Sequence, residues 1–434
     1  MREDILRHLT AGKAPASSVR TGAALVIATQ LILSACATPQ RLAAVPSADT
    51  ARAMTTIPDA RFFPDRDPEA FVRMMGAAAN RELAARGLER GAGPLPPVSY
   101  LTISGGGGDG AFGAGLLVGW TEAGTRPTFK YVTGISTGAL IAPFAFLGSD
   151  YDPILKETYT QVTDDNIFRK RDITALMFSD AMADTTPMAE MVSRYVTRDL
   201  LDRIAAEYAR GRLLFIGTTD LDAREAVYWN MGAIATSQDP AALELFRKIT
   251  LASAAIPGAF PPIMIDVTVD GQPYQEMHVD GGASRQVFLY PPAIHLRDLA
   301  TEAGLDRDRH LYIIRNSRLD PDWASVDRRL MSIVNRSVSA LIHAQGLGDL
   351  NRMFLTSRRD GLDYHLAYIP RDFMVVKTSE FDSVYMNALF ERGRTMAAAG
   401  YVWDKFPPGY APEDAVTIRQ DATSSSGGKI SDPA

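Results

Sequence analysis

The stretch "YVTGISTGALIAPFAF", residues 131–146, joins two apolar runs through a short glycine-flanked turn. Gly134, Ser136 and Gly138 form the pattern Gly-x-Ser-x-Gly, in which the glycines let a sharp turn from strand to helix close around the serine. The serine hydroxyl is then expected at a helix N-terminus, where the positive end of the helix dipole favours developing negative charge. Ser136 is therefore a candidate nucleophile. The alternative is a small residue that only closes a tight turn.

Alternating strand and helix patterns continue on both sides of this turn. "VSYLTIS" at 98–104 is typical of a strand, and "GGGGDGAFGAGLLVGW" at 105–120 predicts a glycine loop that leads into a helix. "RLLFIGTTDL" at 212–221 predicts another buried strand, and residues 241–255 a further helix. This order of elements predicts an α/β fold with a central, mostly parallel sheet flanked by helices.

A serine hydroxyl needs a base within hydrogen-bonding reach. None of the six histidines lies in a glycine-flanked loop late in the chain, and His278 is expected to be structural. A hairpin turn at Asp270-Gly271 delivers a strand to Asp280, which is followed by two glycines. These glycines allow a tight turn behind the carboxylate, so Asp280 is a candidate base. The alternative is an aspartate that only initiates a turn.

The glycine loop also contains a G-x-G-x-x-G pattern from Gly105 to Gly110. A dinucleotide site needs an acidic residue at the end of the second strand, but that strand ends in Thr133-Gly134 and enters the serine turn. No Gly-Lys-Ser/Thr follows, which excludes a Walker A loop. No two histidines lie within four residues of each other. The sequence therefore predicts neither a cofactor nor a metal.

Together these motifs resemble the patatin-like phospholipase family over roughly residues 98–292. Two further stretches are similar to family segments, "FIGTTDL" at 215–221 and "LASAAIPGAFPP" at 251–262. In that family a serine and an aspartate form a catalytic dyad without histidine. The resemblance implies a patatin-like α/β hydrolase with Ser136 as nucleophile, Asp280 as base, and an oxyanion hole in the loop of Gly106, Gly107, Gly108 and Gly110.

The implied activity is hydrolysis of carboxylic esters of lipids, as in a phospholipase A or lysophospholipase, at a membrane surface. One position departs from the family pattern, because Asp109 stands where relatives usually carry Arg or Lys. The carboxylate either repels anionic head groups or pairs with a nearby cation. The alternative function is a catalytically weak or inactive lipid-anchored binding or scaffold protein on the same fold.

The N-terminus carries four basic residues, among them Arg7, Lys13 and Arg20, before the apolar run "TGAALVIATQLIL" at 21–33. This run is too short to span a bilayer and suits the core of a signal peptide. It ends in "LSAC", which resembles a bacterial lipobox, so Cys36 is expected to be lipidated after removal of residues 1–35. By resemblance to the sorting of lipoproteins, Ala37 in place of Asp favours the outer membrane of the cell envelope if the cell is Gram-negative. The alternative is an ordinary signal peptide in which Cys36 is incidental.

The net charge of −6 and the scattered Lys and Arg side chains argue against nucleic acid as a partner. The family resemblance implies a lipid substrate, and the resemblance to a lipobox implies attachment to a membrane. Asp67 and Pro68 predict the start of a helix. The sequence divides into a signal peptide at 1–35, a lipidated N-terminus and flexible tether at 36–66, an N-terminal helix and linker at 67–97, a catalytic core at 98–292, a C-terminal part with added helices at 293–408, and a disordered tail at 409–434.

Replacing Cys36 tests the lipobox. The Cys36→Ser variant should stay an unprocessed precursor or become soluble, because lipid chains supply about 0.8 kcal/mol of membrane affinity per buried methylene. Mass spectrometry of the mature N-terminus and membrane fractionation measure both effects. Normal processing with unchanged membrane partition would show that Cys36 is incidental.

Overall fold

The computed structural model of the protein describes residues 40–91, 94–171 and 180–410. The predicted signal peptide, Cys36 and most of the predicted C-terminal tail lie outside these residues. Among the described helices, none combines the length and the apolar character that a membrane span requires.

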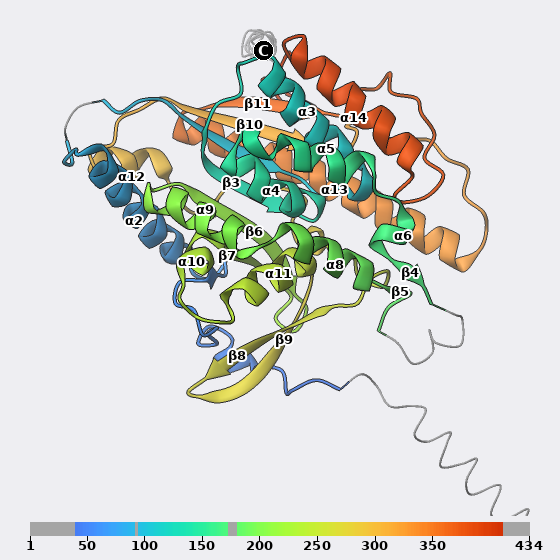
Figure 1. Cartoon of the computed structure of the whole chain (residues 1–434), viewed down its shortest axis with the longest axis horizontal. Coiled ribbons are helices and arrows are strands. Elements are labelled where there is room, and N and C mark those ends of the chain that lie inside the picture. The colour runs from blue at the N-terminus through green and yellow to red at the C-terminus, as the bar shows by residue number, and fades with distance from the viewer. Residues whose placement is uncertain (1–39, 92–93, 172–179, 411–434) are drawn as a thin grey trace, which may run out of the picture.

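A nine-stranded sheet forms the centre of the described molecule, with the order β1-β7-β6-β3-β2-β10-β11 and β9 paired with both β6 and β8 (Figure 1). Strands β6, β3, β2, β10 and β11 run parallel to one another, whereas β1, β7, β8 and β9 pair with their neighbours antiparallel. The predicted fold class, α/β with a mostly parallel sheet, is confirmed. The strands are β1 (Arg61–Phe62), β2 (Val98–Ile103), β3 (Phe129–Ile135), β6 (Leu213–Asp220), β7 (Glu225–Asn230), β8 (Ile263–Val269), β9 (Gln272–Asp280), β10 (Arg309–Arg315) and β11 (Leu362–Tyr368), and β4 (Arg169–Lys170) pairs with β5 (Ala183–Asp184) separately.

Alternating side chains of the strands enter two apolar layers. Leu101 and Ile103 of β2 pack with helices on one face, whereas Val98 and Tyr100 pack with helices on the other. Both faces of the central strands are therefore buried, as expected for a parallel sheet. The first layer includes α3 (Gly110–Glu122), α4 (Thr137–Leu147), α5 (Asp152–Thr160), α8 (Thr186–Tyr195), α9 (Arg198–Ala209), α10 (Met231–Thr236), α11 (Ala242–Ser253) and α14 (Ser383–Ala398), and the second includes α2 (Pro68–Arg86), α12 (Leu296–Glu302) and α13 (Leu330–Asp360).

The register of the strands brings three loops to one edge of the sheet. Ile103 pairs with Gly134, and Ile135 pairs with Gly217, so β2, β3 and β6 reach this edge together. The glycine loop follows β2, and the serine turn follows β3. Strand β9 runs antiparallel to β6 and pairs its last residue, Asp280, with β6. The carboxyl ends of two parallel strands and the end of β9 therefore converge.

Helix α2 begins as predicted. The Asp67 side chain caps it by accepting a hydrogen bond from the Ala70 amide at 2.9 Å, and Pro68 is its first residue. Phe71 and Met74 face the sheet and are buried. The apolar stripe of the helix thus packs on the body of the protein.

The prediction of a flexible tether is wrong for residues 40–66. Arg41 pairs with Asp222 at 2.6 Å, and β1 adds to the edge of the sheet at β7. The scattered apolar residues of this segment are buried against distant strands, which a local search for periodicity misses. The buried apolar residues are Val45, Ala53, Ile57, Ala60, Phe62 and Phe63.

The C-terminal part is integral to the sheet rather than an addition to it. Strand β10 lies between β2 and β11, and α14 packs along α3. The two helices approach closely because Gly115 and Gly119 of α3 face the backbone of α14 at Phe390 and Arg394, where a Cβ atom would overlap carbonyl oxygens. The sheet therefore needs residues beyond the predicted core.

Candidate active site

Ser136 occupies a sharp turn between β3 and α4. Its backbone has φ +55° and ψ −124°, a conformation that non-glycine residues rarely adopt. The amide of Ser136 donates to the Ser253 hydroxyl at 3.0 Å, and that hydroxyl donates to the Gly217 carbonyl at 2.6 Å. A Cβ atom on Gly134 would overlap the carbonyl of Gly138 across the turn. These contacts hold the strained serine in place.

The Asp280 carboxylate lies beside this serine. It interacts with the Ser136 side chain through a hydrogen bond and accepts the Gly282 amide at 2.7 Å. Burial raises the pKa of Asp280 to about 6, although both hydrogen bonds act to lower it. The structure therefore brings together the predicted nucleophile and the predicted base, each nearly buried.

The glycine loop lies directly against Ser136. A Cβ atom on Gly105 would come within 3.2 Å of the Ser136 Cβ, and one on Gly110 would overlap the Thr137 hydroxyl. The amide of Gly110 donates within the turn, to the carbonyls of Gly107 and Gly108. Gly110 thus contributes close packing, and its amide is already engaged within the turn.

Asn316 was not identified from the sequence, yet it holds the glycine loop. Its backbone amide donates to the Ser104 hydroxyl at 2.8 Å, and its side-chain amide donates to the Ser104 carbonyl at 3.0 Å. Its side-chain oxygen accepts the amide of Gly113 at 3.0 Å. This fully buried side chain joins the start of the loop to α3. No local pattern around residue 316 indicates this role.

Asp109 pairs with a cation, which was one of the two outcomes expected from the sequence. Lys377 places its Nζ 3.5 Å from an Asp109 oxygen and 3.1 Å from the carboxylate of Glu380. Burial raises the pKa of Asp109, and Lys377 opposes this shift. The cation missing from the loop itself is therefore supplied by a segment far along the chain.

Glu380 also contacts the glycine loop. Its carboxylate accepts the Gly108 amide at 3.4 Å, and a Cβ atom on Gly107 would overlap the same oxygen. An amide expected to bind an oxyanion thus faces a carboxylate of the protein. The side chain of Glu380 is 45% exposed, so part of it faces solvent.

Comparison with known proteins gives a clear assignment for this part of the chain. The family model for patatin-like phospholipases matches residues 101–292. Residues 101–292 are a patatin-like phospholipase domain. The match includes the glycine loop, the serine turn and the Asp280 turn.

Three solved structures are similar to the chain at low identity. VipD from Legionella pneumophila is 13% identical, with 70% of this chain and 67% of VipD covered and a TM-score of 0.33. ExoU from Pseudomonas aeruginosa, in complex with SpcU, is 14% identical over 70% of this chain and 52% of ExoU, with a TM-score of 0.28. Human GIVD cytosolic phospholipase A2 is 12% identical over 66% of this chain and 52% of the human chain, with a TM-score of 0.24. The chain thus spans about half the length of the last two. No curated protein matches the chain in sequence.

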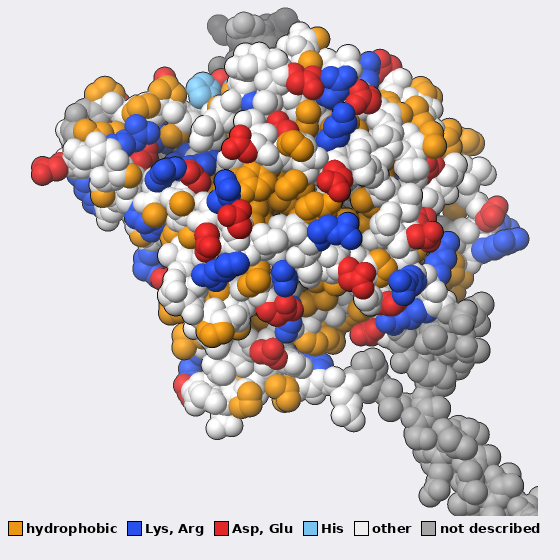
Figure 2. Space-filling model, in the orientation of Figure 1, with side chains coloured by type: hydrophobic (Ala, Val, Ile, Leu, Met, Phe, Trp, Pro, Cys, Tyr) orange, Lys and Arg blue, Asp and Glu red, His pale blue; other side chains and the backbone are white. Residues whose placement is uncertain are grey.

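An apolar cavity of ≈ 50 Å³ adjoins the serine turn of the patatin-like domain. Thr137, which follows Ser136, lies in its wall together with side chains of α4, α5, α8 and α14. Figure 2 shows hydrophobic surface gathered near the middle of the molecule, in the area of α4 and α5 in Figure 1. The apolar lining includes Leu140, Phe144, Val162, Ile167, Val192 and Phe381.

His278 has partners other than Ser136. Its Nδ1 lies 3.0 Å from the Thr218 hydroxyl, and its Nε2 lies 3.2 Å from a carboxylate oxygen of Glu276. Glu276 also forms an ion pair with Arg61, which lowers the pKa of this carboxyl to about 2 against the effect of burial. The fully buried His278 therefore joins β9 to β6 and β1, as expected of a structural residue.

Two clusters in the described residues have side chains of the types that bind metals, although the spacing of the histidines predicted no metal site. His310, Asp363 and His365 come together because β10 and β11 are neighbours. Lys405 lies 2.7 Å from Asp363 and 2.7 Å from His365 within this cluster, so an ammonium group occupies part of it. The second cluster is Asp220 with the Glu276 and His278 pair described above.

The raised pKa of Asp280 predicts the pH dependence of ester hydrolysis. The charged carboxylate is the form that accepts a proton, so kcat/KM for a neutral ester should rise with pH through about 6 and then level off. Below pH 6 the rate should fall about tenfold per pH unit, as expected for one protonation. A pH profile with p-nitrophenyl butyrate measures this. An inflection near pH 4 would contradict the burial of the carboxylate.

Proposed function

We propose that the protein is a lipid acyl hydrolase that cleaves carboxylic esters through a Ser136–Asp280 dyad. The observation that carries the proposal is the contact between the Ser136 side chain and the buried Asp280 carboxylate. The family of residues 101–292 supports a lipid as the substrate. Phospholipids and lysophospholipids are the first substrates to test.

The chemistry follows from the positions of these groups. Asp280 accepts the proton of the Ser136 hydroxyl as the oxygen attacks the acyl carbonyl. The amides of Gly106, Gly107 and Gly108 and the N-terminal end of α4 stabilise the oxyanion. The leaving alcohol takes the proton from Asp280, and water then releases the acyl group with Asp280 again acting as base.

The apolar cavity beside Thr137 has room for only the first carbons of an acyl chain. It begins next to the nucleophile, and its walls are mainly aliphatic and aromatic. A chain in this cavity would leave the ester at Ser136 and the alcohol portion toward the glycine loop. Lys377 then offsets part of the negative charge of Asp109 and Glu380 that an anionic head group would meet.

Exposed apolar residues near the site favour action at a membrane surface. Gln286 donates to the Gly282 carbonyl beside Asp280 and also to Gln345 of α13, which places α13 next to the dyad. The part of α13 that precedes Gln345 is largely exposed and runs to the right-hand edge of the molecule in Figure 1. Exposed apolar patches of this kind mark contacts with lipid or protein. The residues are Leu330, Met331, Ile333, Val334, Val338, Leu341 and Ile342 on α13 and Met374, Val375 and Val376 before Lys377.

The second candidate function is an inactive or weakly active lipid-anchored binding protein. The contact between Glu380 and the Gly108 amide favours it, because a carboxylate at an oxyanion donor opposes catalysis. Turnover of an ester by the purified mature domain separates the two functions.

Removing either member of the dyad should abolish most turnover. Ser136→Ala loses the nucleophile, and Asp280→Asn loses the proton acceptor, so each should reduce kcat by about 10³-fold or more. Only variants that retain Ser136 should react with a fluorophosphonate probe. His343→Gln on α13 is the matched control and should keep wild-type rates. A folded His278→Gln protein as inactive as Ser136→Ala would replace the dyad with a triad.

Lys377 should determine how fast anionic lipids are hydrolysed relative to neutral esters. Lys377→Met leaves the Asp109 and Glu380 carboxylates without their cation, so turnover of phosphatidylglycerol should fall several-fold relative to that of p-nitrophenyl butyrate. An ion pair of this exposure contributes about 1 kcal/mol, or about fivefold. The exposed Lys156 provides the control variant Lys156→Met. An unchanged ratio between the two substrates would exclude a contact of Lys377 with head groups.

A further inference from the structure

A second, larger cavity lies at the opposite end of the sheet from Ser136. It has a volume of ≈ 370 Å³ and is bounded by α2, α12 and the first residues of β2, β3 and β10. Tyr100, Lys130 and Arg309 contribute from these strands. Lys130 is near the start of β3, whereas Ser136 follows its end. The two sites therefore lie at opposite ends of one strand, and this cavity has no part in the proposed chemistry.

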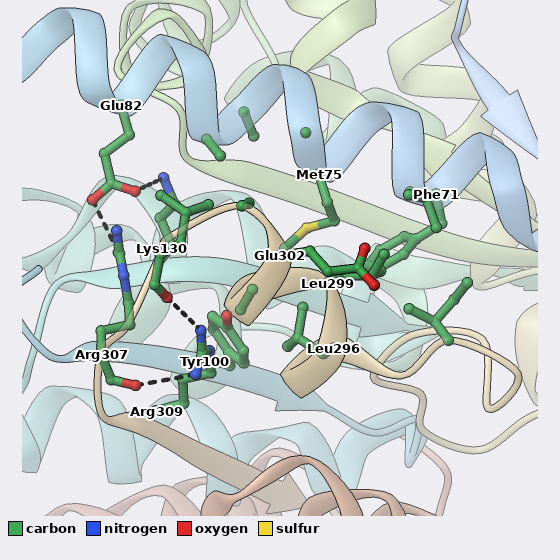
Figure 3. A pocket seen from close by; sticks show the side chains of 18 of the residues that line it. Phe71, Met75, Glu82, Tyr100, Lys130, Leu296, Leu299, Glu302, Arg307 and Arg309 are labelled. Atoms are coloured by element: carbon green, nitrogen blue, oxygen red, sulfur yellow. Dashed lines mark hydrogen bonds and ion pairs between the residues drawn. The ribbon is translucent and has the colours of Figure 1, made fainter. Parts of the chain in front are cut away.

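The cavity has an apolar side and a charged side (Figure 3). Phe71 and Met75 of α2 and Leu296 and Leu299 of α12 form the apolar side. Lys130, Arg307 and Arg309 gather with Glu82 and Tyr100 on the other side in this view. Its volume is within the range of about 300–1,000 Å³ that is typical of small-molecule sites. A ligand with an apolar chain and a polar head matches this division.

Positive charge exceeds negative charge on the polar side. The Glu82 carboxylate faces Lys130 at 2.7 Å, Arg307 at 3.0 Å and Arg86 at 3.2 Å, so one acid serves three cations. The Lys130 side chain is only 14% exposed. Its burial lowers the pKa of this ammonium group to about 8, despite the ion pair with Glu82. A further anion beside Lys130 would compensate this desolvation.

Arg309 adds a cation that has no carboxylate partner among the ion pairs of the described residues. Its guanidinium donates to the carbonyls of Arg307 at 3.1 Å and Leu305 at 3.0 Å, and it interacts with the Tyr100 hydroxyl. Arg90, which also lines the cavity, donates to the side-chain oxygen of Asn80 at 2.9 Å. The other acid in the lining, Glu302, lies on the apolar side in Figure 3. The polar end thus offers positive charge to a ligand.

We propose that this cavity binds a single-chain amphiphile with an anionic head, such as a medium-chain fatty acid. The head lies against Lys130 and Arg309, and the chain lies along α2 and α12. Neutral or cationic amphiphiles of the same length lack the negative charge that would pair with Lys130 and Arg309. The proposal is independent of the hydrolase function, because none of these residues contacts the Ser136–Asp280 dyad.

Direct binding to a protein that cannot turn over esters tests the proposal. Sodium decanoate, decanol and decyltrimethylammonium are titrated into the Ser136→Ala variant by isothermal titration calorimetry, below the concentrations at which they form micelles. Decanoate should bind at least tenfold more tightly than the other two ligands. Equal affinity for all three would overturn the proposal. Decyl phosphate serves as a fourth ligand, and tighter binding than decanoate would identify the head as a phosphate.

A substitution that fills the cavity tests whether decanoate binds there. Gly76 of α2 lines the cavity, and a Cβ atom there meets nothing within 4 Å. Gly76→Leu should therefore fold well, because leucine also favours the helix more than glycine does, and it should weaken decanoate binding at least tenfold. Ala84→Leu, at an exposed position of the same helix, is the matched control and should bind normally.

Removing a cation gives a second measurement. Arg309→Met should weaken decanoate binding at least fivefold and should leave the weak binding of decanol unchanged, since only the charge is lost. Unchanged decanoate binding in both Gly76→Leu and Arg309→Met would place the ligand elsewhere, such as in the cavity beside Thr137, and would overturn the proposal. These results stand whether or not the wild-type protein hydrolyses esters.

Discussion

The strained backbone of Ser136 is the constraint on which the arrangement of the site depends. A non-glycine residue in such a conformation costs about 1–3 kcal/mol and persists only where its surroundings enforce it. Here the surroundings are a hydroxyl relay from Ser253 to Gly217 and two glycines that let β3 and α4 approach each other. The relay joins the serine turn to β6, and the pairing of β6 with β9 positions Asp280. The contacts that enforce the strained turn therefore join β3, β6 and β9 and hold both candidate catalytic side chains.

Burial brings the pKa of the candidate base Asp280 close to that of a histidine. An exposed aspartate, with a pKa near 3.8, would be a weak base at neutral pH, whereas a carboxyl with a pKa of about 6 is close to the range in which proton transfer is effective. The two hydrogen bonds to the carboxylate limit this rise, so the group remains charged at neutral pH. The carboxylate of this candidate base is thus mostly ionised at neutral pH and more basic than an exposed aspartate. The nearby histidine contacts Glu276 and Thr218, so Asp280 remains the candidate base.

The local signals in the sequence were sufficient for the fold class and for the turns that meet at the sheet edge. Gly-x-Ser-x-Gly, the glycine loop and Asp-Gly-Gly are short motifs whose geometry is set by their own residues. The packing of residues 40–66 was missed because their apolar side chains have no period and find partners on β7 and β8. Asn316, Lys377 and Glu380 were missed for a related reason. Each reaches the glycine loop from a distant segment, and the sequence around it has no pattern that distinguishes it from a surface residue.

The pairing of Asp109 with Lys377 has a consequence for how the charge of the site is determined. A basic residue within the glycine loop would be fixed to the same turn as the amides that are expected to bind the oxyanion. Here the positive charge is that of Lys377, which lies in the segment that joins β11 to α14. That segment also carries Glu380 and three exposed apolar residues. A displacement of this one segment would expose the Asp109 carboxylate and release the Gly108 amide at the same time. The electrostatic character of the site is thus separable from its catalytic geometry, and selection can change the one without disturbing the other.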